Sequence, residues 1–361
     1  MSKKSAYAFV VHPRGYGDIL SNIKITKFFP KFLVKKVLKL VRPFIVSGIS
    51  GLKSLDNGEE LKGLVIGVPL FPKDIIENRI LAKKRIEQAV DLAKKNGASV
   101  VGLGGLLGSV SEGGAGLIKR EGITVTAGRA YTAFVVTEYL YNSINRFGLN
   151  KEEIIIAIIG AAGGVGSTVI KVLSKEKFKK IILIDLERKL EKVHSLLEKI
   201  EKNNTDIYVS HKIHDVIEAD IIITATNAPE AVLKSEDIKT GAIIIDDAQP
   251  SDISPEVIKS RKDIIIIEAG VITAKNIRSG TSFRLANKNE IYCCLGEVMS
   301  IAASDWNGNY SAGDISIETI NQIASTAKKI GFKLAPYQSF GKIVTSETIT
   351  KVQEIILARP R

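Results

Sequence analysis

The sequence predicts an α/β protein whose central part is built on a parallel β-sheet, and three observations support this. Residues 154–159 are six consecutive apolar residues, as expected for a strand buried on both faces. Further short apolar runs follow at intervals, separated by helical or turn-forming sequence, which favours parallel strands with right-handed crossovers. A glycine-rich turn and a helical pattern come directly after the first run. Together they predict a doubly wound sheet of the Rossmann type.

The glycine-rich turn has the spacing that a dinucleotide pyrophosphate requires. Gly160, Gly163 and Gly166 form the pattern G-x-x-G-x-x-G, and Gly164 adds a fourth glycine. Glycine lets phosphates approach the backbone, and the helix that follows offers N–H groups and a partial positive charge. The same turn also contains Ala162 and Val165, and we predict that all six residues contact the cofactor. The alternative is a helix packed tightly on a strand without a ligand.

Two further positions complete the predicted cofactor site. Asp185 ends the next apolar run, 19 residues after Gly166, where a carboxylate that binds the adenosine ribose is expected. Thr226 and Asn227 lie at the carboxyl end of a later strand, predicted over 220–226. The carboxyl ends of parallel strands meet at one edge of a sheet, so we expect these two residues to border the nicotinamide.

The pattern divides the chain into three segments. Residues 1–147 are predicted to form the first part of a substrate domain, with strands at 6–12, 64–70, 100–103 and 124–126 and helices at 75–96 and 128–146. Residues 148–285 are the predicted dinucleotide-binding domain. Residues 286–361 contain helical patterns at 290–303 and 317–330 and are expected to return to the substrate domain, which is therefore an α/β domain completed by C-terminal helices.

Bulk properties limit the protein's class. The chain has 361 residues and a formal net charge of +12, which favours an acidic partner or a polyanionic cofactor. No nucleic-acid-binding motif accompanies this charge, so we expect no nucleic-acid partner. There is no apolar run of about 18 residues and no signal-peptide pattern, and the two cysteines are adjacent in sequence, so we expect a reducing cytoplasm.

Residues 27–46 form the most basic amphipathic stretch. Phe29, Leu33, Val37, Leu40 and Phe44 recur at helical spacing, and lysines occupy another face. One interpretation is an ordinary surface helix with its apolar side on the core. The others are a helix that lies on a membrane surface, which would make the protein peripheral to the membrane, or one that faces an acidic protein.

Cys293 and Cys294 are the sharpest candidates for chemistry. A thiolate beside a nicotinamide can accept an acyl group, and hydride transfer to the resulting thioester yields an aldehyde. The start of a helix would lower the pKa of such a thiol. The alternative is a pair of buried cysteines that act as small hydrophobic residues. His12, at the end of a strand, is a weaker candidate, and no spacing indicates a metal site.

The chain resembles the long-chain acyl-[acyl-carrier-protein] reductases, a family that makes fatty aldehydes from acyl thioesters. The likeness covers most of the chain, in blocks that begin Gly102-Leu-Gly-Gly, Thr126-Ala-Gly-Arg, Ile158-Ile-Gly-Ala-Ala-Gly-Gly, Ile244-Ile-Asp-Asp-Ala-Gln-Pro and Ile291-Tyr-Cys-Cys-Leu-Gly-Glu. The resemblance implies that Cys294 is the nucleophile, that the acyl group arrives on acyl-carrier protein or coenzyme A, and that a nicotinamide cofactor reduces the acyl-enzyme.

Asp185 departs from the family pattern. Family members use NADPH and commonly have a basic residue at this position, whereas a carboxylate favours the ribose hydroxyls of NADH. We therefore expect NAD(P)H with a slight preference for NADH, which Arg188 and Lys189 partly offset. Two other functions remain open: a shikimate-dehydrogenase-like oxidoreductase that uses Lys73 on a small hydroxy acid, and a non-catalytic nucleotide-binding module associated with a membrane.

Overall fold

The computed structural model describes residues 6–117, 122–248, 250–304 and 313–359, and the chain forms two compact units. Unit 1 comprises residues 1–131 and 272–333, and unit 2 comprises residues 132–271 and 334–361. This division differs from the expected one. Residues 132–147 belong to unit 2, residues 272–285 belong to unit 1, and only the first part of the 286–361 segment returns to unit 1.

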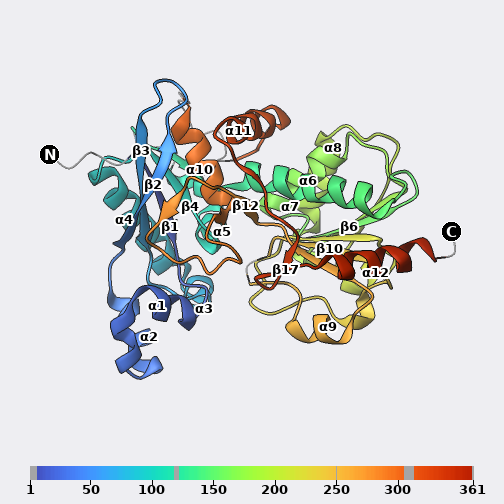
Figure 1. Ribbon diagram of the computed structural model, residues 1–361, viewed down its shortest axis with the longest axis horizontal. Helices are drawn as coiled ribbons and strands as arrows, with labels where there is room; N and C mark the ends of the chain where they lie inside the picture. The colour runs from blue at the N-terminus through green and yellow to red at the C-terminus, as the bar shows by residue number, and fades with distance from the viewer. Residues whose placement is uncertain (1–5, 118–121, 249, 305–312, 360–361) are drawn as a thin grey trace. The chain divides into compact units, whose positions relative to one another are not determined.

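Unit 2 contains a parallel six-stranded sheet in the order β11-β10-β9-β6-β7-β8 (Figure 1). The strands are β6 (Ile155–Ile159), β7 (Lys180–Ile184), β8 (Asp206–Ser210), β9 (Ile221–Thr224), β10 (Ile243–Asp246) and β11 (Ile265–Glu268). Read from the β8 edge in chain order, this is the 3-2-1-4-5-6 arrangement of the Rossmann fold. The predicted fold class, a doubly wound α/β sheet of Rossmann type, is confirmed.

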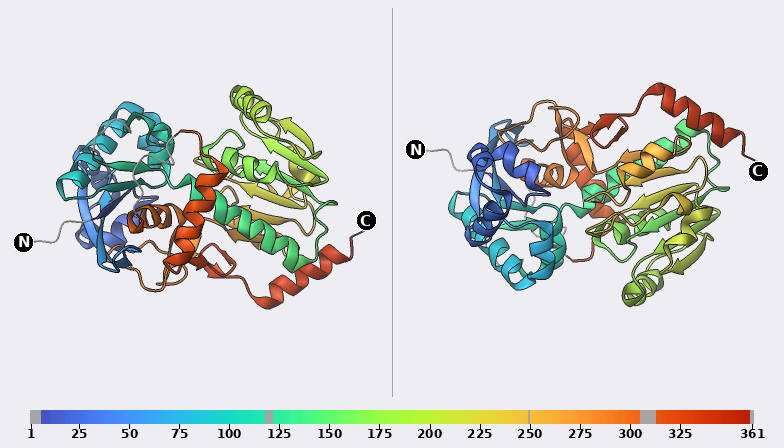
Figure 2. Two further views of the ribbon diagram at one scale, coloured as in Figure 1. Left: turned by 90° about the horizontal axis from the view of Figure 1, so that it is seen from above. Right: turned by 90° about the horizontal axis from the view of Figure 1, so that it is seen from below.

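Helices pack on both faces of the unit 2 sheet (Figure 2). They are α6 (Arg129–Phe147), which begins in unit 1, α7 (Gly164–Leu173), α8 (Leu190–Lys199), α9 (Pro255–Ser260) and α12 (Ser346–Leu357). The 3-10 turns η3 (Glu187–Lys189), η4 (Ile213–Glu218) and η5 (Ser235–Asp237) complete the connections. Five of the strands are isoleucine-rich and mostly buried, as parallel strands covered by helices are expected to be, whereas the edge strand β8 is partly exposed.

Unit 1 contains a mixed six-stranded sheet in the order β13-β2-β3-β1-β4-β5. β1 (Tyr7–Val11), β3 (Glu60–Gly67), β4 (Val100–Leu103) and β5 (Thr124–Thr126) are parallel. β2 (Phe44–Lys53) and β13 (Arg278–Ser279) extend the sheet in antiparallel pairs. The strand expected at 64–70 spans Glu60–Gly67 instead, and a long strand begins at Phe44, within the stretch 27–46 whose apolar spacing predicts a helix.

The helices of unit 1 cover its sheet in two sets. α3 (Pro72–Glu77) and α4 (Arg79–Lys95) replace the single helix expected over 75–96, because Asn78 interrupts it and caps α4 by accepting from the Leu81 N–H. α4 packs on one sheet face, against Val10 and Val101. α10 (Cys293–Ala303) contacts β1 and β4, and Gly102 lies beneath its Val298.

The remaining elements are short. α1 (Tyr16–Asn22), the 3-10 turn η1 (Lys24–Phe28) and α2 (Lys31–Leu40) follow β1, and α5 (Leu106–Val110) and the 3-10 turn η2 (Glu112–Leu117) follow β4. α11 (Ile317–Lys329) is the last helix of unit 1. A small three-stranded sheet has the order β14 (Glu290–Tyr292), β12 (Val271–Thr273) and β15 (Lys333–Leu334). β16 (Gln338–Ser339) and β17 (Lys342–Ile343) form a separate two-stranded sheet. Within the described ranges, no helix combines the length and apolar character needed to cross a membrane.

Candidate functional site

The glycine turn between β6 and α7 is so tight that glycine is required at each of the three spaced positions. Gly160 has φ +89°, and a Cβ atom there would lie 2.6 Å from the Ala225 carbonyl oxygen. At Gly163 and Gly166, a Cβ atom would lie 2.9 and 2.2 Å from the Gly160 carbonyl oxygen. α7 begins at Gly164, so Val165 and Gly166 lie in its first turn, where N–H groups have no partner within the helix.

Asp185 lies beside this turn and helps to hold it. The residue follows β7 and is 8% exposed. Its Oδ2 accepts from the Ala162 N–H at 2.8 Å, and its Oδ1 accepts from the Leu186 N–H at 2.8 Å. The Lys189 ammonium lies 3.5 Å from the same Oδ1. The structure thus brings the predicted ribose-binding carboxylate to the predicted pyrophosphate loop, as dinucleotide recognition requires.

Thr226 and Asn227 follow β9, next to the same turn. A Cβ atom at Gly160 would lie 3.3 Å from the Thr226 amide nitrogen. The Thr226 hydroxyl donates to Asp252 Oδ1 at 2.5 Å and accepts from the Ala228 N–H at 3.0 Å. Because its hydroxyl is engaged within the loop, Thr226 has its methyl group left to offer a ligand. Asn227 is exposed.

Three carboxyl groups gather at the carboxyl ends of β9 and β10. Asp246 is buried and accepts from the Thr224 hydroxyl at 2.6 Å and from the Ser251 hydroxyl. Burial is the main cause of the raised pKa in all three groups, and for Asp252 it raises the pKa to about 7. The pKa of Asp247 is raised well above its ordinary value by burial and by the charges of Asp246 and Asp252. Gln249, in the same sequence block, lies outside the described residues.

In unit 1, Cys294 occupies the first turn of α10. Cys293 is 1% exposed, whereas Cys294 is partly exposed, so the two adjacent thiols differ in access. Cys294 packs directly against Gly128, which follows β5 and has φ +72°. A Cβ atom at Gly128 would lie 2.2 Å from the Cys294 Cβ and 2.3 Å from its Cα. Gly128 therefore allows α10 to present Cys294 at the carboxyl end of the parallel strands.

A buried glutamate in α10, which the sequence analysis did not single out, fixes this contact. Glu297 is 0% exposed. Its carboxylate accepts from the Thr126 hydroxyl and, at 2.7 Å, from the Tyr131 N–H in the first turn of α6. Thr126 Oγ1 also accepts from the Gly128 N–H at 2.9 Å. The available signal was an acidic residue within an otherwise apolar helical stretch, three positions after Cys294.

His12, also in unit 1, has both ring nitrogens engaged by backbone groups. Its Nε2 accepts from the Leu106 N–H at 3.2 Å, and its Nδ1 lies 3.2 Å from the Pro13 carbonyl oxygen. These partners require a neutral ring with the proton on Nδ1, and burial lowers the His12 pKa to about 4. The backbone N–H groups of residues 102–109 are candidate oxyanion donors for the tetrahedral intermediate of acyl transfer. Those of Gly104, Leu106 and Leu107 already donate to Val10, His12 and Gly104.

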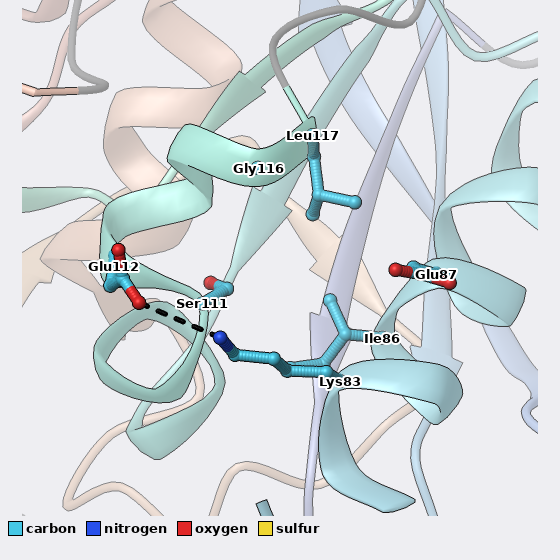
Figure 3. Close-up of a pocket in the computed structure, with 7 residues that line it drawn as sticks. All are labelled: Lys83, Ile86, Glu87, Ser111, Glu112, Gly116 and Leu117. Carbon is cyan, nitrogen blue, oxygen red and sulfur yellow. Dashed lines mark ion pairs between the residues drawn. The ribbon is translucent and has the colours of Figure 1, made fainter. Parts of the chain in front are cut away.

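A cavity of about 100 Å³ lies between α4 and the α5–η2 segment (Figure 3). It is lined by Lys83, Ile86, Glu87, Ser111, Glu112, Gly116 and Leu117. Lys83 and Glu112 form an ion pair across it at 3.5 Å. Neither Cys294 nor a glycine-loop residue lines this cavity, so it belongs to neither the candidate cofactor site nor the candidate nucleophile site. Within the described residues, no cluster of His, Cys, Asp and Glu is suited to a metal ion.

Comparison with known proteins supports the oxidoreductase assignment of unit 2. The family model described as shikimate / quinate 5-dehydrogenase matches residues 144–268, less than half of the chain. A solved structure of shikimate dehydrogenase in complex with NADP+ is 16% identical, covers 91% of this chain and 97% of that one, and has a TM-score of 0.42. Over residues 144–268 the chain is therefore similar to the shikimate / quinate 5-dehydrogenases.

Three characterised proteins are similar over longer or shorter stretches. The long-chain acyl-[acyl-carrier-protein] reductase of Synechococcus elongatus is 23% identical over 77% of this chain and 84% of its own length. Aminotransferase PigE of a Serratia species is 22% identical over 82% of this chain but 35% of its own length. Glutamyl-tRNA reductase of Caldivirga maquilingensis is 30% identical over 50% of this chain and 42% of its own length. The chain thus spans about a third of PigE and less than half of the glutamyl-tRNA reductase.

Proposed function

We propose that this protein reduces a long-chain fatty acyl thioester to a fatty aldehyde through an acyl-enzyme on Cys294. The observation that carries the proposal is the position of Cys294. It is partly exposed in the first turn of α10, while the adjacent Cys293 is buried. The similarity to the Synechococcus elongatus reductase, which extends over 84% of that protein, supports the same reaction class.

The first half-reaction is acyl transfer. The Cys294 thiolate attacks the carbonyl carbon of the incoming thioester, a C–S bond to Cys294 forms, and the carrier thiolate leaves. Cys294 lies in the first turn of α10, where the helix dipole places a partial positive charge that stabilises a nearby anion. Gly128 and the Glu297 hydrogen bonds hold the first turn of α10 in register with the carboxyl ends of β4 and β5.

The second half-reaction is reduction of the Cys294 thioester. When bound, the reduced nicotinamide supplies the hydride. The C–S bond then breaks, the aldehyde leaves and the Cys294 thiolate is regenerated. The proposed cofactor contacts are the glycine turn (Gly160, Ala162, Gly163, Gly164, Val165 and Gly166) for the pyrophosphate, Asp185 for the adenosine ribose, and Thr226 and Asn227 for the nicotinamide side.

We propose NADH as the slightly preferred cofactor. The buried Asp185 carboxylate lies beside the glycine turn, where it would accept from ribose hydroxyls and repel a 2′-phosphate. Lys189 offsets this effect only in part, because it already pairs with Asp185. The proposed carrier is acyl-carrier protein or coenzyme A, both of which are anionic and suit a chain of net charge +12.

The test is aldehyde formation by paired cysteine variants. Cys294→Ala is expected to produce no aldehyde from acyl-CoA or acyl-carrier protein with either reduced cofactor. Cys293→Ala is the matched control, because it removes the same atom one residue away, and it should retain activity within about fivefold after the loss of a small buried group. Normal aldehyde output from Cys294→Ala would eliminate the covalent route.

The second candidate function is a shikimate-dehydrogenase-like reaction on a small hydroxy acid, which the family model over residues 144–268 favours. Lys73, its candidate catalytic lysine, is 81% exposed on α3 and pairs with Glu77 at 3.7 Å, which is an ordinary surface arrangement. Loss of activity on hydroxy acids in Lys73→Ala, but not in Cys294→Ala, would support this candidate against the acyl reductase.

A further inference from the structure

The segment after β1 exposes an unusual number of large apolar side chains. η1 and α2 lie together at one end of unit 1, beside α1 (Figure 1). Their most exposed apolar residues are Phe28 at 84%, Leu40 at 78%, Phe32 at 74% and Ile25 at 66%. Phe29, Leu33 and Val37 are 40–51% exposed. We call these seven side chains, together with Lys27 and Lys36, the η1–α2 surface.

The exposure arises because the apolar sector of α2 is wider than the part that the protein covers. Val34 and Leu38 are buried and pack with Ile19 and Phe71. Leu33, Val37 and Leu40 continue the apolar sector on the helix side that faces away from this cluster. Leu33, Val37 and Leu40 belong to the apolar stripe that the sequence spacing predicts, and in the structure they face solvent. An ordinary surface helix would bury them.

The charged residues of this segment are all basic. No acidic residue occurs in the sequence between Asp18 and Asp56, whereas residues 24–42 include six lysines and Arg42. Lys31 and Lys35 lie over the rings of Tyr16 and Phe71, and Lys39 pairs with Asp74 at 2.6 Å. Those three lysines occupy the flank of α2 next to the protein.

The lysines on the outer side are differently placed. Lys27 and Lys36 are exposed and have no ion-pair partner among the described residues. The outer side therefore combines protruding phenylalanines with uncompensated positive charge. A partner that fits it must accept apolar side chains and carry negative charge.

We propose that the η1–α2 surface docks on the surface of an anionic phospholipid bilayer. Phe28, Phe32 and their apolar neighbours would enter the interfacial region, and Lys27 and Lys36 would contact the headgroups. A bilayer accommodates separate protruding side chains without a complementary pocket, whereas an acidic protein would be matched mainly through charge. The proposal is independent of the proposed reaction, because it concerns binding and not turnover.

Vesicle co-sedimentation of the full-length protein tests this proposal. The wild type is expected to bind vesicles that contain phosphatidylglycerol and to bind pure phosphatidylcholine vesicles much more weakly. Phe28→Ser/Phe32→Ser should lose at least about tenfold in binding to the anionic vesicles. The matched control, Ile343→Ser/Leu357→Ser, removes two apolar side chains that are 47% and 63% exposed in unit 2 and should bind like the wild type.

Charge variants test the electrostatic half of the proposal. Lys27→Glu/Lys36→Glu should weaken anionic-vesicle binding by at least about 25-fold, since each cation near an anionic surface contributes about fivefold. The control Lys192→Glu/Lys351→Glu makes the same charge change at exposed positions of α8 and α12 and should have a small effect. A blue shift of indole emission in Phe32→Trp on adding anionic vesicles, absent in Tyr208→Trp, would show insertion.

Three outcomes would overturn the proposal. One is failure of the wild type to bind anionic vesicles at low salt. Another is equal loss of binding in the η1–α2 variants and their controls. The third is tight binding of purified acyl-carrier protein that Lys27→Glu/Lys36→Glu abolishes while vesicles do not bind, which would assign the surface to an acidic protein. None of these outcomes depends on whether Cys294 accepts an acyl group.

Discussion

The two sheets of this protein use glycine for different purposes at their carboxyl edges. In unit 2, Gly163 and Gly166 make room for the carbonyl of Gly160, only a few residues away in the same turn. In unit 1, Gly102 and Gly128 make room for Val298 and Cys294, about 170–200 residues away in sequence. The first arrangement shapes a local ligand loop, whereas the second admits a distant helix that carries the candidate nucleophile.

Both edges also anchor a loop with a side chain from the end of a neighbouring strand. In unit 2, Asp185 accepts from the Ala162 N–H. In unit 1, His12 accepts from the Leu106 N–H. One anchor is a carboxylate that also suits a ribose, and the other is a neutral imidazole whose two nitrogens are both engaged by backbone. These anchors belong to the proposed cofactor edge in unit 2 and the proposed acyl-transfer edge in unit 1, each of which can be disrupted separately.

The largest expected effect is that of Gly128→Ala. The new methyl group would overlap Cys294 and would occupy a left-handed backbone position. Displacement of the nucleophile by about 1 Å costs about 100-fold in rate, so we expect acylation of Cys294 to slow by that factor or more. Dinucleotide affinity, measured by fluorescence titration, should change less than twofold. An acylation rate equal to that of the wild type would remove Gly128 from the account.

Gly166→Ala should produce the opposite pattern. Its methyl group would lie 2.2 Å from the Gly160 carbonyl oxygen, and overpacking of this kind costs about 2 kcal/mol. We expect the dinucleotide Kd to rise about 30-fold while acylation in the absence of cofactor remains normal. Gly15→Ala is the control, because a Cβ atom at Gly15 meets nothing within 4 Å. Equal losses in both half-reactions would contradict the separation of the two edges.

The His12 anchor predicts a pH dependence of stability. Its pKa is lowered to about 4 in the folded protein, from an ordinary value of 6.5. The unfolded chain therefore takes up the proton first, and the free energy of unfolding should fall as the pH decreases from about 6.5 to about 4. This pKa shift sets an upper limit of about 3 kcal/mol on the loss of unfolding free energy. Partial exposure of the His12 side chain reduces the expected loss to about 2 kcal/mol.

Urea denaturation between pH 7 and pH 4.5 measures this term as the difference between the wild type and His12→Gln. The glutamine oxygen can still accept from the Leu106 N–H but does not titrate in this range. The wild type should lose stability relative to the variant as the pH falls. Parallel pH profiles would show that His12 is not the anchor that we describe.

Asp185→Asn should have the smallest effect, and it tests the proposed preference of unit 2 for NADH over NADPH. The amide retains an acceptor for the loop but removes the charge that repels a 2′-phosphate. We expect the ratio of NADPH to NADH affinity to rise about tenfold, or about 1.4 kcal/mol. Asp206→Asn removes an exposed charge from the same unit and should leave the ratio unchanged. An unchanged ratio in Asp185→Asn would remove the basis for a preference for NADH.

Local elements could be predicted from the sequence, whereas contacts between residues far apart in the chain could not. The strands predicted at 154–159 and 220–226 and the glycine turn are local signals, and these two strands lie within a few residues of β6 and β9. The contacts of Glu297 with Thr126 and Tyr131 join residues 166 or more positions apart, which no local pattern reveals. Phe44 was assigned to a helix because apolar spacing alone cannot show that Val41 ends α2 and that a β-strand follows.

The most direct test of the account is mass spectrometry of the protein after incubation with a long-chain acyl-CoA and no reduced cofactor. The account predicts one acyl adduct that hydroxylamine removes, mapped by peptide sequencing to Cys294 and absent from Cys294→Ala. An unmodified protein that still forms aldehyde once NADH or NADPH is added, or an adduct on Cys293 alone, would contradict it.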